Sequence, residues 1–295
     1  MSFYQRALQG ARTMPLDGPS MERLRAAQAF IQNQANEFQG SLDGALASFE
    51  PENDVAKIRL NHALEMMAGK RAIELQQPSV LYYPYLAQRQ FFERDEFEWA
   101  AKLEAVSPII RGELLNLLND GADFRPYVQD DPNRPTRDFH GLNNSRSWTA
   151  LYLWRNAALV PEIADRCPQT VEAFAQVPLT HIGRRTPSVF FSRLEAAAHI
   201  PPHHGLLNCR LICHLPLIVP PGCWLRVGNE TRQWEDGKLL IFDDSMEHEA
   251  KNPTGHLRIV LIFDIWRPEL TEDERSGISA IFNAIDAFQP SADLA

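Results

Sequence analysis

Apolar residues recur at helical spacing through most of the first 175 residues. Met21, Leu24 and Ile31, for example, fall on one side of a helix with 3.6 residues per turn. The pattern predicts four helices, over 20–38, 54–75, 97–118 and 161–174. Pro108 predicts a kink or an interruption in the third helix, because proline removes a hydrogen bond from a helix interior.

Short apolar runs separated by turn-forming residues replace the helical pattern after Val189. The runs are rich in Val, Ile, Leu and Phe and cover 190–197, 209–219, 223–227, 238–243 and 256–265. Asp236-Gly237 predicts a hairpin between the two runs beside it. Runs of this length and spacing indicate an antiparallel β core of jelly-roll type. Helical spacing returns over 271–288, so the expected fold class is α+β.

The composition of two stretches indicates how the chain is organised. Residues 76–79 read Gln-Gln-Pro-Ser, which is typical of a boundary. We therefore expect a helical N-terminal region over 1–77 and a second domain over 78–295, whose β core covers about 185–268. The stretch 130–138 holds two prolines and alternating charges, which predicts a surface loop.

Charge and cysteine content narrow the classes of partner and of compartment. The 295 residues include 29 basic and 38 acidic side chains, and the net charge of −9 disfavours nucleic-acid and anionic-membrane surfaces. No apolar run approaches the roughly 18 residues of a membrane helix, and the N-terminal sequence contains no apolar segment long enough for a signal peptide. Four irregularly spaced cysteines are too few for a disulfide framework. We therefore expect a cytoplasmic protein without nucleic-acid or membrane partners.

Polar residues interrupt the apolar pattern inside the predicted β core. On the second run, Arg210 and His214 share a face with Ile212, and such a face must meet water or a polar ligand. On the last run, Arg258 shares a face with Asp264, and a buried guanidinium without a partner would cost several kcal/mol. Two structural alternatives stand beside a ligand site: an ion pair between Arg258 and Asp264, and a solvated position for Arg210 at a sheet edge.

A series of motifs runs through this region in one order. They are Pro202-His203-His204-Gly205, Asn208-Cys209-Arg210-Leu211, Val227-Gly228-Asn229-Glu230-Thr231, Ile241-Phe242-Asp243-Asp244-Ser245, Glu247-His248-Glu249 and Asp264-Ile265-Trp266-Arg267-Pro268. From about Ser192 to Arg275 the chain resembles the aspartyl/asparaginyl β-hydroxylase family of iron- and 2-oxoglutarate-dependent oxygenases. The resemblance implies a double-stranded β-helix, which is the jelly-roll expected above, with Fe(II), the cosubstrate 2-oxoglutarate and O2.

The resemblance implies that His203 and His248 hold the iron and form the catalytic centre. Gly205 stands where most relatives in the wider superfamily have a carboxylate ligand, so 2-oxoglutarate and water would fill the other metal positions. His204 ranks second as a ligand, because adjacent residues on a strand point in opposite directions.

The resemblance also implies a set of residues that bind the cosubstrate. Arg258, ten residues after His248, matches the arginine that binds the distal carboxylate of 2-oxoglutarate. Ser192 matches the hydroxyl partner of that arginine, and His214 matches the histidine at the proximal carboxylate. We place Arg210 with these cosubstrate-binding residues.

These inferences favour an Fe(II)- and 2-oxoglutarate-dependent dioxygenase that hydroxylates an unactivated C–H bond. The substrate expected is a small molecule or peptide, oxidised at the β-carbon of an aspartyl, asparaginyl or related amino-acid-like group. Ile212 stands where the vertebrate peptide hydroxylases have a substrate-facing arginine, which predicts a less acidic or smaller substrate. Two alternatives are a non-catalytic metal- or ligand-binding jelly-roll with a regulatory or scaffold role, and an oxygenase that performs desaturation or cyclisation.

Overall fold

The structure is a computed structural model and describes residues 16–47, 49, 53–130, 139 and 141–288. Its contacts divide the chain into two units, Met1–Ile73 and Glu74–Ala295. The loop expected over 130–138 lies almost entirely outside the described residues. Within the described ranges, no helix combines the length and the apolar character needed to cross a membrane.

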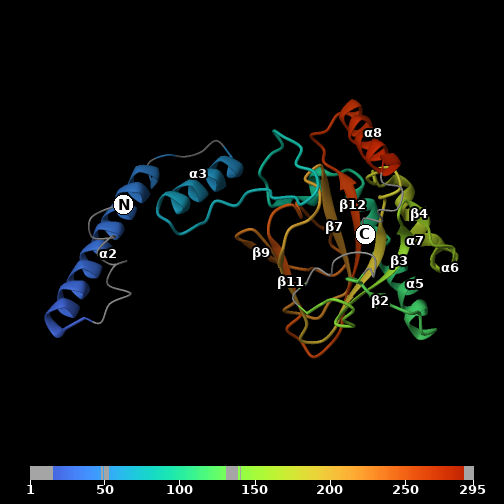
Figure 1. The fold of residues 1–295 in the computed structure, drawn as a ribbon, viewed down its shortest axis with the longest axis horizontal. Coiled ribbons are helices and arrows are strands. Elements are labelled where there is room, and N and C mark those ends of the chain that lie inside the picture. Colours follow the sequence, from blue (N-terminus) through green and yellow to red (C-terminus); the bar gives the residue numbers. More distant parts are fainter. Residues whose placement is uncertain (1–15, 48, 50–52, 131–138, 140, 289–295) are drawn as a thin grey trace. The chain divides into compact units, whose positions relative to one another are not determined.

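Two helices make up the described part of the first unit, α2 (Gly18–Ala47) and α3 (Asp54–Met67) (Figure 1). α2 is longer than the predicted 20–38 and has no buried residue. The prediction that the second helix reaches residue 75 is wrong. Gly69 has a φ of +69°, the left-handed conformation that ends helices, and the Ala68 N–H closes the last turn on the Leu64 carbonyl.

The helices of the second unit are shorter than the apolar patterns over 97–118 and 161–174 predict, except the last, which matches the predicted 271–288 within one residue. They are η1 (Arg94–Glu96), α4 (Ala100–Ala105), α5 (Ser107–Asn119), α6 (Pro161–Ala164), α7 (Pro168–Ala173), η2 (Phe174–Gln176) and α8 (Glu272–Phe288). The interruption predicted at Pro108 is confirmed: α4 ends before Val106, and Pro108 lies in the first turn of α5. A proline there costs no hydrogen bond, because the first N–H groups of a helix have no partner within it.

Two antiparallel sheets form the rest of the second unit (Figure 1). The larger has the order β1-β10-β7-β12-β5-β3-β2, with β4 beside β3, and the smaller has the order β6-β11-β8-β9. The larger sheet contains β1 (Phe91–Phe92), β2 (Arg125–Pro126), β3 (Trp148–Arg155), β4 (Ala158–Leu159), β5 (Val189–Leu194), β7 (Arg210–Ile218), β10 (Leu240–Phe242) and β12 (Arg258–Trp266). The smaller contains β6 (His199–His203), β8 (Trp224–Val227), β9 (Glu230–Gln233) and β11 (His248–Lys251). Together they form the predicted double-stranded β-helix, and the fold class is α+β.

Side-chain alternation along the central strands separates two cores. One face of β7 and β12, including Leu211, Cys213 and Leu261, packs against α4 and α5. The opposite face, which includes Val260, packs against Val227 and other residues of the smaller sheet. The polar residues predicted on β7 and β12 therefore belong to the face between the two sheets, where the strands enclose a site.

The hairpin predicted at Asp236-Gly237 is wrong. β9 pairs with β8 and β10 pairs with β7, so this turn leads from the smaller sheet to the larger one. The hairpin in this region is the turn at Gly228-Asn229, between β8 and β9. The strong turn signal of Asp-Gly marks a turn here, but it does not determine which strands pair.

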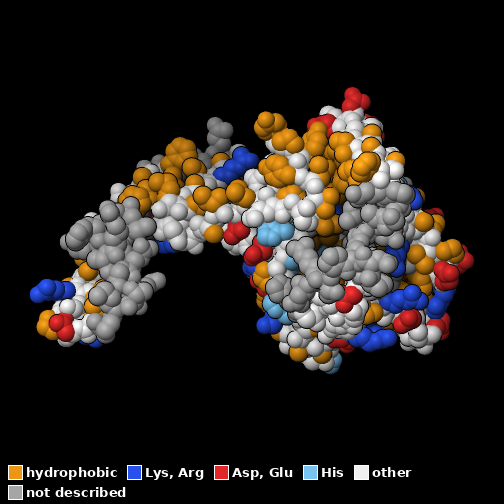
Figure 2. Space-filling view, in the orientation of Figure 1, with side chains coloured by type: hydrophobic (Ala, Val, Ile, Leu, Met, Phe, Trp, Pro, Cys, Tyr) orange, Lys and Arg blue, Asp and Glu red, His pale blue; other side chains and the backbone are white. Residues whose placement is uncertain are grey.

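α8 packs against the rest of the second unit with only part of its apolar surface. Ile278 and Phe282 are buried in a cluster with Trp266, whereas Ile281 and Ile285 are exposed. On the face shown in Figure 2, hydrophobic side chains gather over this helix.

Candidate metal and cosubstrate site

His203 and His248 meet on neighbouring strands of the smaller sheet. They are directly opposed in the pairing of β6 with β11, and their ring centroids are 4.0 Å apart. Two imidazoles at this separation can bind one metal ion.

Each imidazole is held by a hydrogen bond to the backbone carbonyl two residues earlier. His203 Nδ1 lies 2.8 Å from the Pro201 carbonyl oxygen, and His248 Nδ1 lies 3.0 Å from the Met246 carbonyl oxygen. A carbonyl oxygen can only accept, so each Nδ1 carries the proton and each Nε2 carries the lone pair that binds a metal. Burial lowers the pKa of His248 to about 4, which keeps this ring neutral near pH 7.

Gly205 packs against a carboxylate that comes from another part of the chain. The Gly205 N–H donates to the Asp244 carbonyl at 2.6 Å, and a Cβ on Gly205 would lie 2.1 Å from Asp244 Oδ2. Asp244 is 6% exposed, its Oδ1 has no hydrogen-bond partner among the described residues, and burial raises its pKa to about 6. Sequence reasoning assigned no role to Asp244, although it lies in one of the quoted motifs.

The described residues contain no group of three or more His, Cys, Asp or Glu side chains that could hold a metal ion. His204 follows the last residue of β6 and is half-buried, outside the direct pairing of His203 with His248. A metal at this site would have the paired histidines as its side-chain ligands.

Arg258 is buried without a carboxylate partner among the described residues. It is 1% exposed, its Nη1 reaches the carbonyl and hydroxyl oxygens of Ser192 at 3.4 and 3.5 Å, and its Nε has no partner. Burial lowers the pKa of Arg258 to about 10, so the side chain is still charged near pH 7. A buried cation without a counter-charge is unfavourable, which fits a bound anionic ligand.

Ser192 and His214 lie on β5 and β7, the two strands that flank β12. Ser192 Oγ accepts a hydrogen bond from Trp148 Nε1 at 3.1 Å. His214 is buried and its Nδ1 has no partner among the described residues. Burial, and then the charge of Arg258, lower the pKa of His214 well below its usual value, so the ring is neutral.

Trp234 joins this group although sequence reasoning gave it no role. The Arg258 guanidinium carbon lies 4.7 Å from the centroid of the indole, and the His214 ring lies nearly parallel to it at 6.0 Å. The Trp234 Nε1–H is buried and has no acceptor among the described residues. Arg258, His214 and Trp234 thus lie together, and each has a buried polar atom without a partner among the described residues, which fits the carboxylate groups of 2-oxoglutarate.

The contacts of Arg210 contradict both structural alternatives, the Arg258–Asp264 ion pair and a solvated Arg210 at a sheet edge. Its Nη1 lies 3.2 Å from Asp264 Oδ2 and its Nη2 lies 3.5 Å from Asp244 Oδ2. Asp264 therefore pairs with Arg210 rather than with Arg258, and Arg210 is enclosed rather than solvated at an edge. Burial alone lowers the pKa of Arg210, but the two carboxylates raise it above its usual value. Its assignment to the cosubstrate stays a prediction.

Aromatic side chains line the site beside His203. The Phe139 ring meets the imidazole edge to face at 5.2 Å, and Trp148 lies 6.4 Å from it. Trp148 stacks on Tyr127 at 4.1 Å, and Tyr127 stacks on Phe190 at 5.4 Å. This wall comes from segments far apart in the sequence, so no local pattern could have identified it.

Known proteins are similar in sequence to this region. The family described as aspartyl/asparaginyl β-hydroxylase matches residues 104–268. The human aspartyl/asparaginyl β-hydroxylase is 34% identical over 185 residues, which are 62% of this chain and 23% of that protein. The ornithine lipid ester-linked acyl 2-hydroxylase of Rhizobium tropici is 34% identical over 191 residues, 64% of each chain. A solved Pseudomonas putida prolyl-4-hydroxylase covers 57% of this chain and 99% of its own at 14% identity, with a TM-score of 0.34.

Proposed function

The chain belongs to the aspartyl/asparaginyl β-hydroxylase family, and from this premise we propose that it is an Fe(II)- and 2-oxoglutarate-dependent dioxygenase that hydroxylates an unactivated C–H bond. One observation carries the proposal: the buried Arg258 lacks a carboxylate partner among the described residues and contacts Ser192, whose hydroxyl accepts a hydrogen bond from Trp148 beside His203. A protein that only bound a metal would gain nothing from an unpaired guanidinium in its core.

The residues of the site have separate tasks in this proposal. His203 and His248 would hold Fe(II), which with 2-oxoglutarate and O2 supplies the oxidising power for C–H cleavage. Arg258 and Ser192 would bind the distal carboxylate, and the neutral His214 would hydrogen bond to the proximal end. The aromatic wall around Trp148 would exclude water from the space beside the histidines.

The charges of the site favour a substrate without a carboxylate at the reacting position. Asp244 and Asp264 share the single cation of Arg210, and Arg258 would offset one negative charge of the cosubstrate. With Fe(II) and 2-oxoglutarate bound, these formal charges cancel, so a substrate carboxylate would add an uncompensated buried charge. On β7, the residue between Arg210 and His214 on the same face is the apolar Ile212, which offers no positive charge to a substrate carboxylate.

We propose that the reaction takes place at the β-carbon of an amino-acid-like group that carries no charge beside the reacting carbon. The names of the two relatives describe an aspartyl or asparaginyl residue and an acyl chain as reacting groups, so both kinds of substrate belong in the first screen. Desaturation or cyclisation, and a metal- or ligand-binding role without turnover, are the alternatives. A cytoplasmic location and the lack of nucleic-acid and membrane partners stay predictions.

Anaerobic titration with Fe(II) and then with 2-oxoglutarate tests the proposal, with binding followed by calorimetry. A screen of amino acids, peptides and acyl amphiphiles under O2 then follows succinate formation and product mass. We expect 2-oxoglutarate to bind only after the metal and one substrate class to give a product heavier by one oxygen. Failure to bind 2-oxoglutarate would refute the proposal, and a product lighter by two hydrogens would favour desaturation or ring closure.

A further inference from the structure

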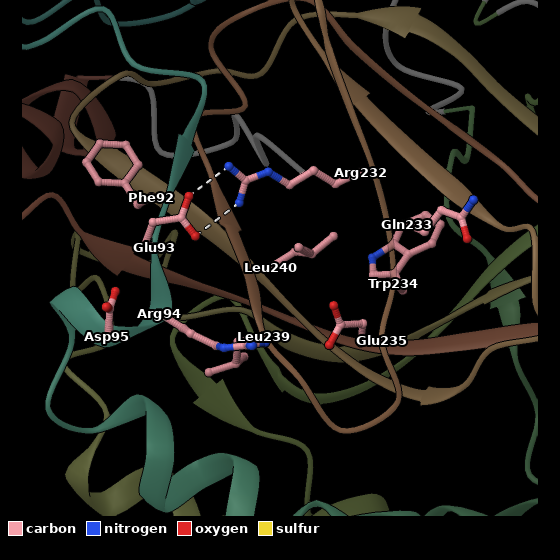
Figure 3. A pocket seen from close by; sticks show the side chains of 10 residues that line it. All are labelled: Phe92, Glu93, Arg94, Asp95, Arg232, Gln233, Trp234, Glu235, Leu239 and Leu240. Carbon is pink, nitrogen blue, oxygen red and sulfur yellow. Dashed lines mark hydrogen bonds and ion pairs between the residues drawn. The ribbon is translucent and has the colours of Figure 1, made fainter. Parts of the chain in front are cut away.

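A cavity of about 660 Å³ lies outside the cosubstrate site, between η1 and the segment from β9 to β10 (Figure 3). Its apolar walls are Phe92, Trp234, Leu239 and Leu240, and charged side chains lie around them. Among these charged side chains, Arg232 is paired with Glu93 at 2.8 Å.

Two of the wall residues also belong to the candidate cosubstrate site. Trp234 is 6% exposed, although it lines the cavity, because its ring also packs beside Arg258 and His214. Leu240 is directly opposed to His214 in the pairing of β10 with β7. The indole of Trp234 and the side chain of Leu240 therefore separate the cavity from the position that the cosubstrate would occupy.

We propose that Trp234 sets the length of the 2-oxo diacid that this protein accepts. The indole lies against the Arg258 guanidinium and blocks its retreat toward the cavity. The indole thereby fixes how far this guanidinium lies from the paired histidines, and so the length of the diacid that can bind between them. This inference rests on the proposed function, and it adds a specificity-determining residue that contacts the guanidinium instead of the metal.

The physical argument has two parts. Attraction between a desolvated guanidinium and an indole face holds Arg258 in place, and Arg258 has no carboxylate among the described residues to hold it instead. Removal of the indole would also join the cosubstrate site to the cavity of about 660 Å³, which gives Arg258 and a longer diacid room to move. A smaller side chain at position 234 should therefore weaken 2-oxoglutarate binding and favour its homologue with one more methylene, 2-oxoadipate.

The test compares the dissociation constants of 2-oxoglutarate and 2-oxoadipate for the Mn(II)-loaded full chain, by calorimetry without O2. Trp234→Leu should weaken 2-oxoglutarate binding about tenfold, and should lower the ratio of the 2-oxoadipate constant to the 2-oxoglutarate constant at least about fivefold. Trp234→Phe keeps an aromatic face beside the guanidinium, so its 2-oxoglutarate affinity should stay within about threefold of the wild type. Leu240→Ala opens the same wall by another route, and should lower the ratio even if Trp234→Leu does not fold.

Leu239→Ala is the matched control, because Leu239 lines the cavity but packs in the core on the helical side of the sheet. It should leave the ratio unchanged. An unchanged ratio in both Trp234→Leu and Leu240→Ala, with normal binding by the wild type, would overturn this inference alone. A wild type that binds Mn(II) but neither diacid would overturn the proposed function and this inference together.

Discussion

His203 and His248 share one side-chain geometry in the smaller sheet. His204, which follows the last residue of β6, does not share it among the described residues. His203 and His248 each donate Nδ1–H to a carbonyl two residues earlier, so Nε2 of each ring is the nitrogen that would bind the proposed metal. His203→Ala or His248→Ala should each remove most bound Fe(II), because a single imidazole remains, whereas His204→Ala should retain it. Metal analysis of the three purified variants decides the assignment, and equal iron loss in His204→Ala and His203→Ala would contradict it.

Arg258 should control cosubstrate affinity through its shape as well as its charge. Arg258→Ala should weaken 2-oxoglutarate binding by a factor of about 30 or more, because it leaves a buried carboxylate without a partner. Arg258→Lys keeps the charge but loses the paired N–H donors, so its affinity should also fall. Calorimetric titration measures both, with Arg185→Lys as the control, because Arg185 is a half-buried arginine whose partner is Asp286 on α8. Metal content should not change, and unaltered 2-oxoglutarate affinity in Arg258→Ala would refute the role.

Gly205 is required because the Asp244 carboxylate occupies the space of a side chain. Gly205→Ala should lower the free energy of unfolding of the metal-free protein by about 1–3 kcal/mol, the usual cost of overpacking. The cost should be smaller in an Asp244→Ala background, where the clashing atoms are absent. Denaturant unfolding of the two single variants and the double variant measures this coupling. Additive losses would show that the crowding at Gly205 has another source.

At the scale of elements, the long apolar strands could be predicted and the short polar ones could not. The runs that became β7 and β12 carry apolar residues on both faces, because helices cover one face and the smaller sheet covers the other. β6, β9 and β11 carry prolines, charges or histidines and are only four or five residues long, so their composition does not indicate strands. His203 and His248 were identified through family motifs, since periodicity alone would have left β6 and β11 as loops.

The remaining parts of the site depend on contacts between distant segments. Trp234, which follows β9, contacts Arg258 on β12 because the strands of two sheets bring them together. Asp244, which follows β10, packs against Gly205, which follows β6. The pairing of Asp264 with Arg210 rather than Arg258 follows from strand register, because Asp264 lies opposite Ile212, two residues along β7 from Arg210 and on the same face. A single sequence contains no signal for such registers.

A buried polar network connects the segment before β1 to the turn between β10 and β11. Arg267 Nη1 lies 2.7 Å from Asp243 Oδ2, and both side chains are fully buried. Gln76 Nε2 donates to the same carboxylate oxygen at 2.6 Å. Arg267→Met should lower the free energy of unfolding by about 3–5 kcal/mol, because it leaves the Asp243 carboxylate without its cation. The double variant Arg267→Met with Asp243→Leu should recover part of this loss in chemical denaturation, and no recovery would show that the two residues act separately.

For the whole molecule, the described core residues belong to the second unit. The buried apolar clusters contain residues from Phe91 to Phe282, and α2 contributes no buried residue. We therefore propose that residues 74–295 fold and bind Fe(II) and 2-oxoglutarate without the first unit. The melting temperature and 2-oxoglutarate affinity of this truncated chain should match those of the full chain.

The exact start of such a truncated chain should matter. A chain that begins at residue 78, the boundary expected from composition, lacks Gln76, which hydrogen bonds to Asp243 and to Asn208 inside the network. Loss of these contacts leaves buried polar groups without partners, which costs about 1–3 kcal/mol for each group. Residues 78–295 should therefore unfold at a lower denaturant concentration than residues 74–295, and Gln76→Ala in the longer chain should reproduce most of the difference. Equal midpoints for the two truncated chains would show that Gln76 is dispensable, whereas aggregation of both would show that the second unit depends on residues before 74.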